Sequence, residues 1–124
     1  MVFFASQHHS ATWFGGNPSG PGAEIGDGFN NTNAIIQDCP SAPAAFAARS
    51  LGTDWFLPSI NELKKMYDHK DDLEAVSGFT AFSNSYWSST ENVNFNAWEQ
   101  NFYNGYQNYD YKDYSNYVRA VRAF

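Results

Sequence analysis

Residues 54–67 read DWFLPSINELKKMY and predict a short extended segment that leads into an amphipathic helix. Leu57 precedes Pro58, and the residue before a proline is pushed into an extended conformation. Ser59 and Glu62 have the S-x-x-E spacing of a capping box, in which each side chain accepts a backbone N–H of the other residue. One face of this helix carries the apolar residues Ile60, Leu63, Met66 and Tyr67. The stretch therefore predicts a helix with one buried stripe.

A second helix is predicted upstream, over CPSAPAAFAARSLG at residues 39–52. Ser41 has the side chain of a good N-cap, and Pro43 falls in the first turn, where its missing N–H costs nothing. Alanines form most of the body, and Gly52 is expected to end the helix. The sequence thus predicts two main helices that flank the extended segment at 54–58.

The first quarter of the chain predicts little regular structure. Residues 2–5 have the character of a short strand, whereas residues 6–33 are rich in Gly, Pro, Asn and Ser. Such a composition predicts a long irregular segment, which a compact domain contains only when its fold tolerates loops. Thr32 or Asn33 is expected to cap one short helical turn over residues 34–36.

The pattern changes to a period of two after Gly78, and strand-forming residues dominate. Three strands are predicted, YWSST at 86–90, AWEQNFY at 97–103 and YVRAVRAF at 117–124. Helices followed by antiparallel strands indicate the α+β fold class.

Two arginines interrupt the last predicted strand. In a regular strand Arg119 and Arg122 fall on opposite faces. Because a buried charge is costly without a partner, at least one of them is expected to pair with a carboxylate. Glu62 and Glu91 are the candidate partners.

The composition excludes several classes of protein. A chain of 124 residues suits a single domain over 1–124. Its net charge of −6 supplies no basic patch for a phosphate backbone, so we expect no nucleic-acid partner. No apolar run approaches the length of a membrane span and no signal peptide is recognisable, so we expect no direct membrane insertion. Cys39 is the single cysteine, which excludes an internal disulfide and a CxxC motif.

Several motifs together carry a resemblance to a known family. In chain order they are NNTNAIIQ (30–37), WFLPSINELKKMY (55–67), YWSSTE (86–91), AWEQNFYNGYQN (97–108) and VRAVRAF (118–124). They resemble the bacterial and phage family that includes the C-terminal domain of a collagen-like adhesin, and more narrowly the variable proteins of diversity-generating retroelements. The resemblance covers about residues 23–124. It implies a C-type lectin fold, with two main helices packed on small twisted antiparallel sheets and long irregular loops.

The resemblance also implies a variable region at about 92–117. Such retroelements rewrite adenines, often in AAC codons for Asn, which yields Tyr, Asp, Ser, Phe and others but never Lys, Glu, Gln or Trp. The residues that this rule cannot reach are expected to be unvaried scaffold: Trp98, Glu99, Gln100, Gln107 and Lys112. The candidate ligand-binding residues are Asn92, Asn94, Phe95, Asn96, Asn101, Tyr103, Asn104, Tyr106, Asn108, Tyr109, Asp110, Tyr111, Asp113, Tyr114, Ser115 and Asn116.

The physical chemistry of residues 101–117, NFYNGYQNYDYKDYSNY, favours a recognition surface without reference to genetics. Tyrosine supplies a large rigid contact area, and Asn and Ser supply adaptable hydrogen bonds. Exposed aromatic residues commonly contribute most of the binding energy of an interface. We therefore expect these side chains to point outward together. The scaffold beneath them is expected to comprise Trp55, Leu57, Trp87, Trp98, Phe102, Val118 and Val121.

The favoured interpretation is a non-enzymatic receptor-recognition domain that binds varied protein or cell-surface ligands. It is expected to be displayed on a phage particle or a bacterial surface, and its expected partners besides the ligand are a display module or a second copy of the chain. Two alternatives stay open. One is a carbohydrate-binding lectin or adhesin domain, and the other is an enzyme related to the formylglycine-generating oxidases, which use more cysteines than this chain has.

No cofactor and no metal site is expected. His8 and His9 are adjacent, so they would face opposite sides of a strand, and His69 lies at the end of a helix. Residues 108–113, NYDYKD, offer two carboxylates but lack the spacing of an EF-hand. No arrangement of nucleophile and general base is recognisable.

Overall fold

The computed structural model describes residues 2–4, 9–12, 22–93 and 95–123. Ala5, His8, Asn94 and Phe124, for which the sequence made predictions, lie outside them. Within the described residues the helices are α1 (Gly28–Asp38), α2 (Pro43–Arg49), α3 (Ile60–Asp68) and α4 (Lys70–Glu74). The strands are β1 (Val2–Phe4), β2 (His9–Thr12), β3 (Ser85–Val93), β4 (Asn96–Asn101), β5 (Gln107–Tyr111), β6 (Ser115–Val118) and β7 (Val121–Ala123). The protein is α+β, as the sequence predicts.

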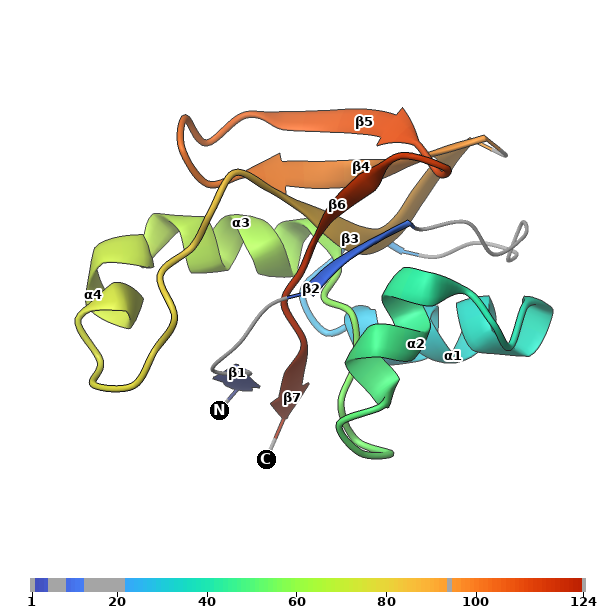
Figure 1. The fold of residues 1–124 in the computed structure, drawn as a ribbon, viewed down its shortest axis with the longest axis horizontal. Coiled ribbons are helices and arrows are strands. Elements are labelled where there is room, and N and C mark those ends of the chain that lie inside the picture. Colours follow the sequence, from blue (N-terminus) through green and yellow to red (C-terminus); the bar gives the residue numbers. More distant parts are fainter. Residues whose placement is uncertain (1, 5–8, 13–21, 94, 124) are drawn as a thin grey trace.

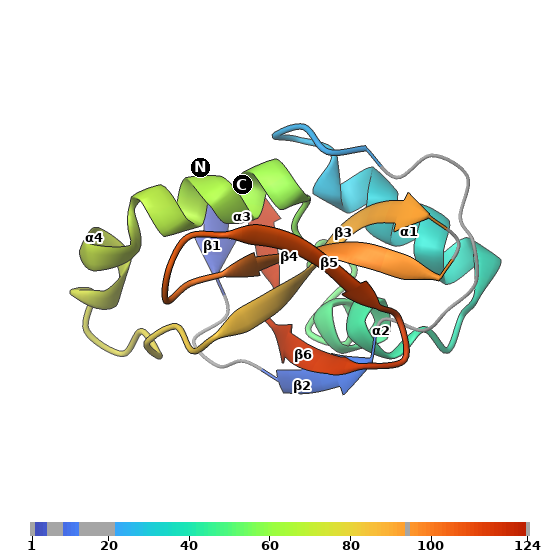
Figure 2. The ribbon, with the colours of Figure 1, turned by 90° about the horizontal axis from the view of Figure 1, so that it is seen from above.

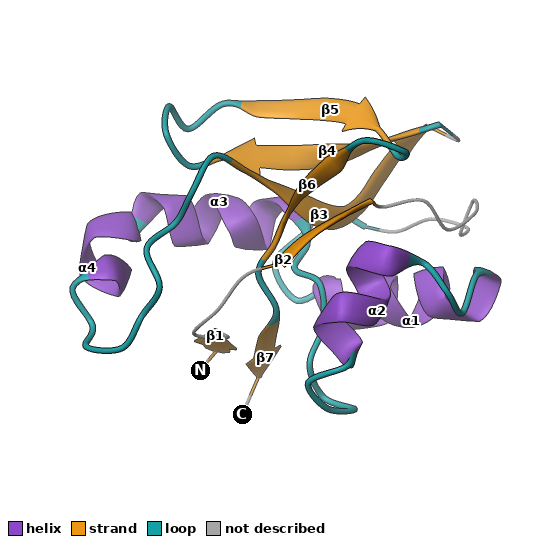
Figure 3. Ribbon diagram, in the orientation of Figure 1, coloured by secondary structure: helices purple, strands orange, loops and turns teal. Residues whose placement is uncertain are grey.

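The strands form two sheets. One has two strands in the order β1-β7, and the other has five in the order β2-β6-β3-β4-β5. Most pairs are antiparallel, but β3 and β6 run parallel, so the larger sheet is mixed and not purely antiparallel as predicted. Helix α3 packs beneath the β4–β5 hairpin, whereas α1 and α2 cover the other end of the sheet (Figures 1 and 3). The β1–β7 pair lies on the opposite side of the molecule from β5 (Figure 1).

The capping box of α3 forms as predicted. The Ser59 backbone N–H donates to Glu62 Oε1 at 2.7 Å, and the Glu62 N–H donates to Ser59 Oγ at 3.2 Å. The Ile60 N–H donates to the hydroxyl of Thr90 at 3.0 Å, which fixes the start of the helix against β3. The residues of the predicted stripe are buried, except that Tyr67 is half-buried and packs edge-on against another ring. This helix therefore forms the rigid floor under the hairpin.

The prediction of an irregular segment over residues 6–33 is wrong in two places. Strand β2 lies inside it and pairs with β6, and the longest helix, α1, begins at Gly28. A Cβ atom at Gly28 would lie 2.9 Å from the Phe56 ring, so this glycine permits close packing and does not mark a loop. Thr32 is not a helix cap but a buried residue of α1, whose hydroxyl accepts the Leu57 N–H at 3.0 Å.

The helix predicted over 39–52 is shorter than expected. Helix α2 has Ala42 at its N-cap, not Ser41, and it ends at Arg49, before Gly52. Pro43 is its first residue, as its fixed φ angle favours. Two main helices were predicted, but α1, α2 and α3 all pack on the large sheet.

The strand predicted over 117–124 divides into β6 and β7, which belong to different sheets. Residues 118–121 are buried in succession, so the expected alternation of faces does not occur. The chain passes from one sheet to the other here, and successive side chains enter the core. An alternation of apolar and polar residues along one regular strand does not predict such a change of sheet.

The predicted partners of the arginines are wrong. The Arg119 guanidinium is buried, donates to the Thr80 carbonyl at 2.7 Å and lies 4.8 Å from the centroid of the Phe82 ring. Arg122 pairs with Asp54 at 3.3 Å, so one arginine does have a carboxylate partner. The two glutamates proposed for this role have other partners. Glu62 belongs to the capping box of α3, and Glu91 pairs with Lys112.

Two clusters of side chains form the core. One joins α1 and α2 to β3 and β4, and the other joins α3 to β3, β7 and the end of β4. Of the predicted scaffold, Leu57, Trp87, Phe102, Val118 and Val121 are buried, and Trp55 and Trp98 are half-buried. No helix in the described part of the chain is long and apolar enough to cross a membrane.

Candidate functional site

The β4–β5 hairpin carries most of the candidate residues. Its register places Asn96 opposite Tyr111, Trp98 opposite Tyr109 and Gln100 opposite Gln107. Strand β5 is the edge of the five-stranded sheet, and Figure 2 shows the hairpin lying across the face of the molecule that is seen from above. Because alternate residues of a strand share a face, the Tyr109 and Tyr111 side chains project on the same side. The Tyr109 ring packs edge-on against Trp98, with centroids 5.4 Å apart.

Six aromatic residues along this hairpin and its flanking turns are exposed. The exposed fraction runs from 51% for Tyr111 to 83% for Tyr103, with Phe95, Tyr106, Tyr109 and Tyr114 between these values. The Tyr111 ring centroid lies 5.4 Å from that of Tyr114 and 6.1 Å from that of Phe95. Tyr111 thus contacts two other rings at the surface, and none of the six aromatic residues belongs to the two core clusters.

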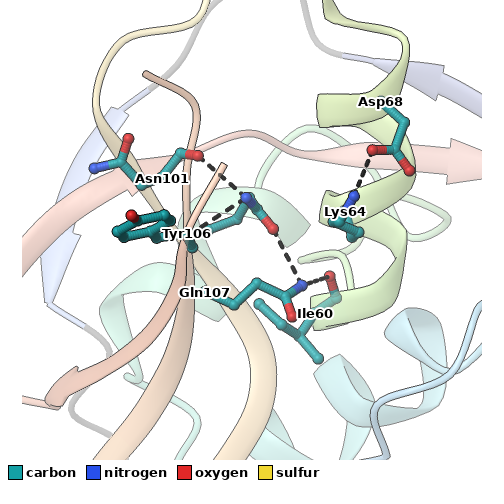
Figure 4. Close-up of polar contacts among 7 residues, drawn as sticks. Ile60, Lys64, Asp68, Asn101, Tyr106 and Gln107 are labelled. Atoms are coloured by element: carbon teal, nitrogen blue, oxygen red, sulfur yellow. Dashed lines mark hydrogen bonds and ion pairs between the residues drawn. The ribbon is translucent and has the colours of Figure 1, made fainter. Parts of the chain in front are cut away.

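Two glutamines hold the β4–β5 hairpin against α3 (Figure 4). Gln100 is fully buried, and its Nε2 donates to the carbonyl of Asn101 at 3.1 Å. Gln107 Nε2 donates to Gln100 Oε1 at 3.1 Å and to the Ile60 carbonyl of α3 at 3.4 Å. The hairpin is therefore anchored by side chains that the sequence analysis assigned to the scaffold.

The turn between β4 and β5 is stabilised by its own asparagines. Asn101 Oδ1 accepts the backbone N–H groups of Tyr103, at 2.7 Å, and of Asn104, at 3.0 Å. Asn104 Oδ1 in turn accepts the Tyr106 N–H at 2.9 Å. Asn101 is half-buried and thus shapes the turn, whereas Asn104 is exposed and is available to a ligand as well.

Besides Asn101, two further candidate asparagines do not lie on the exposed surface. Asn96 is buried, and its Oδ1 accepts a hydrogen bond from Asn92 Nδ2 at 2.8 Å. Asn116 is half-buried and donates to Glu99 Oε2 at 2.6 Å. Asn92, Asn108, Asp113 and Ser115 are exposed, and Asp110 is half-buried.

A buried ion pair holds the far end of the hairpin. Lys112 Nζ lies 2.5 Å from Glu91 Oε1, and both side chains are largely excluded from solvent. The Lys112 N–H also donates to the Phe95 carbonyl at 3.0 Å. The sequence placed Lys112 in the scaffold but did not identify Glu91 as its partner.

The remaining charge on the hairpin is negative. Burial raises the pKa of Glu99, the nearby Asp110 carboxylate raises it further, and the hydrogen bond from Asn116 opposes these effects. Asp110 Oδ1 accepts the backbone N–H of Tyr111 at 3.0 Å. The hairpin thus holds one carboxylate, that of Glu99, in an environment that disfavours its charge.

Three of the exposed aromatic residues border a cavity of about 420 Å³ at the far end of the hairpin. Its lining comprises Asn92, Val93, Phe95, Asn96, Tyr109, Asp110 and Tyr111. It brings together aromatic rings and amide side chains at one end of the hairpin. Val93 was not among the candidate residues, although the codon rule can reach valine.

Comparison with known families settles where the chain belongs. Residues 8–122 match the family described as the Lcl C-terminal domain. The chain belongs to this family. It is the collagen-like adhesin family that the sequence motifs resemble. No curated protein matches the chain.

Membership of the Lcl C-terminal domain family indicates a ligand-binding, adhesin-like domain of a non-catalytic type. The match includes the whole hairpin and all of the candidate residues. Within the described residues, no group of three or more His, Cys, Asp or Glu side chains is placed to hold a metal ion. Cys39 is half-buried, and its sulfur lies 3.6 Å from Ser41 Oγ.

Proposed function

We propose that this Lcl C-terminal domain is a receptor-recognition module with a C-type lectin fold, and that a retroelement diversifies its β4–β5 surface. The surface would bind varied protein or cell-surface ligands by using exposed tyrosines as anchors and Asn, Asp and Ser as adaptable polar contacts. A second candidate is a carbohydrate-binding lectin, since the aromatic cavity could also stack against a sugar ring.

One observation supports diversification most directly. Five residues of 92–117 cannot be produced by the codon rule, and each of them is buried, half-buried or hydrogen-bonded to α3. Gln100 and Lys112 are buried, Trp98 and Glu99 are half-buried, and Gln107 bonds to α3. Most of the reachable side chains are exposed. A process that varied only reachable codons would therefore change the surface and leave its supports intact.

The arrangement of the fold suits display. The β1–β7 pair and the β4–β5 hairpin lie on opposite sides of the molecule (Figure 1). If the β1–β7 side were attached to a phage particle or a bacterial surface, the hairpin would face outward. This localisation is part of the proposal.

Display of two libraries tests the proposal. The first randomises exposed reachable positions (Phe95, Tyr103, Tyr106, Asn108, Tyr109, Tyr111, Tyr114) with NNC codons, and the matched control randomises the unreachable ones (Trp98, Glu99, Gln100, Gln107, Lys112). We expect the first library to be displayed at the level of the parent chain and to yield binders to an arbitrary protein target. The control library should lose display.

Equal loss of display in both libraries, or no binders from the first, would contradict the proposal. The gene offers a second test, because AAC-like codons at the reachable positions and a near-identical template beside a reverse transcriptase gene are expected. A glycan array probed with and without calcium separates the lectin alternative.

A further inference from the structure

Strand β5 is the outermost strand of the five-stranded sheet, so it has one open edge. Figure 1 shows β5 above β4, with no other described element beyond it. The direction of its backbone groups follows from hydrogen bonds at the two ends of the hairpin. The Asn101 N–H donates to the Tyr106 carbonyl at 2.9 Å, and the Lys112 N–H donates to the Phe95 carbonyl at 3.0 Å. The backbone therefore faces β4 at every second residue counted from Tyr106 to Lys112.

The residues between these positions turn their backbone N–H and C=O groups outward. They are Gln107, Tyr109 and Tyr111. The Tyr111 groups are already bonded, because its N–H donates to Asp110 Oδ1 at 3.0 Å and its carbonyl accepts the Tyr114 N–H at 3.0 Å. Among the described residues, no hydrogen bond reaches the outward groups of Gln107 and Tyr109. These two exposed residues therefore offer a short template on which another strand can pair.

The two faces beside this edge differ in chemistry. Alternate residues share a face, so Tyr109 and Tyr111 lie on one side of β5, and Asn108 and Asp110 lie on the other. Glu99 is opposite Asn108 in the register and therefore belongs to the side of Asp110. In the described part of the chain, no lysine or arginine forms an ion pair with either carboxylate. An added strand would meet aromatic rings on one face and negative charge on the other.

We propose that an extended segment of a protein ligand pairs with β5 as a further strand, with apolar side chains beside the tyrosines and basic side chains beside Asp110. The segment exchanges backbone hydrogen bonds with Gln107 and Tyr109 in the antiparallel orientation, which is the more stable one per residue. Pairs of an aromatic and a β-branched side chain, and pairs of opposite charge, are both favourable between neighbouring strands. This inference rests on the proposed recognition function and states which kind of ligand segment the domain takes. Backbone bonds persist while the side chains of the surface vary.

A peptide with this alternation, acetyl-Val-Lys-Val-Arg-Val-amide, tests the inference by NMR titration of the full isotope-labelled chain. We expect saturable shifts, largest at the backbone amides of Gln107 and Tyr109. In the antiparallel register a valine opposite Tyr109 exchanges both hydrogen bonds with it. N-methylation of the central valine should therefore weaken binding about tenfold. N-methylation of the arginine, whose N–H points away from β5, should change the Kd by less than about twofold.

Two variants of Tyr109 separate the contribution of the backbone from that of the side chain. Tyr109→Pro removes the ring and the outward N–H, and proline is tolerated on an edge strand where its nitrogen faces solvent. Tyr109→Ser removes the ring but keeps the N–H. We expect Tyr109→Pro to bind the peptide about tenfold more weakly than Tyr109→Ser. Asp110→Asn, which can still accept the Tyr111 N–H, should weaken binding about threefold, and the control Val76→Ser, on the surface after α4, should leave it unchanged.

Equal weakening by the two N-methyl groups, or loss with the methylated arginine alone, would overturn the inference, as would shifts centred on another surface. The peptide results decide the question even if Tyr109→Pro fails to fold. A dimer of the free chain in analytical ultracentrifugation that Tyr109→Pro abolishes would assign the edge to a second copy and overturn the inference as well. The library selection separates the two proposals. If it yields binders while the peptide does not bind, then strand pairing alone is wrong, and if the peptide binds while the library fails, then diversified recognition is wrong.

Discussion

At the scale of single residues, Lys112 shows how a charged side chain can serve as scaffold within an exposed surface. It lies between Tyr111 and Asp113, yet its side chain is buried and paired with Glu91. Removing one partner of a buried ion pair leaves the other charge buried without compensation. The resulting loss of stability is far larger than the net contribution of the intact pair.

We therefore expect Lys112→Met to lower the free energy of unfolding by about 3 kcal/mol. The matched control is Lys64→Met, because Lys64 and Asp68 form an exposed pair whose loss should cost less than about 1 kcal/mol. Urea denaturation of both variants measures the difference. A similar small loss in both would show that the Lys112 pair contributes no more than a surface contact.

The asparagines show what could not be predicted from residue type. The codon rule treats Asn92, Asn96, Asn101 and Asn104 alike. In the structure Asn96 is buried, Asn101 holds the turn through two backbone N–H groups, and Asn92 and Asn104 are exposed. An asparagine side chain satisfies its own backbone as readily as a ligand, and only the local geometry decides between these roles.

At the scale of elements, the β4–β5 turn depends on Gly105. Its φ angle is +81°, and a Cβ atom there would lie 2.6 Å from Cε2 of Tyr67 on α3. Both the left-handed backbone and the close approach of the hairpin to the helix therefore require glycine.

Replacing this glycine should be more costly than replacing one that is constrained by its backbone alone. Gly78 has a φ angle of +84°, but no atom lies within 4 Å of the place that a Cβ would take, so Gly78→Ala should cost about 1 kcal/mol. Gly105→Ala should cost at least about 1 kcal/mol more, because the Tyr67 ring must also move. Thermal unfolding compares the two. Equal costs would mean that the hairpin does not depend on its contact with α3.

The elements with strong local signals were predicted, and those specified by distant contacts were not. Helix α3 has its capping box and apolar stripe within a few turns of chain, and β3 and β4 have strand-forming residues. Strand β5 is composed of polar and aromatic residues that are mostly exposed, and its position is fixed by pairing with β4. Helix α1 contains Asn and Gly, which are poor helix formers, and it is stabilised by buried contacts to Leu57 and Ser89.

At the scale of the whole molecule, folding and recognition use different aromatic residues. The α+β class and most of the scaffold were predicted, because buried residues must satisfy packing that leaves a pattern in the sequence. Phe82, Tyr86 and Phe102 pack together in the core, with the Phe82 and Phe102 rings stacked at a centroid distance of 4.1 Å. The exposed tyrosines of the hairpin belong to neither core cluster, so their variation should leave the fold intact.

This separation predicts that replacing Tyr103, Tyr106, Tyr109, Tyr111 and Tyr114 together by Ser costs less stability than the single change Phe102→Ala. Surface changes usually cost within about 0.5 kcal/mol each, for a total of at most about 2.5 kcal/mol, whereas truncating a buried phenylalanine costs about 3–5 kcal/mol. Circular dichroism during urea unfolding measures both. If the five-fold variant failed to fold, the tyrosines would be structural, and no surface would be left to vary independently of the core.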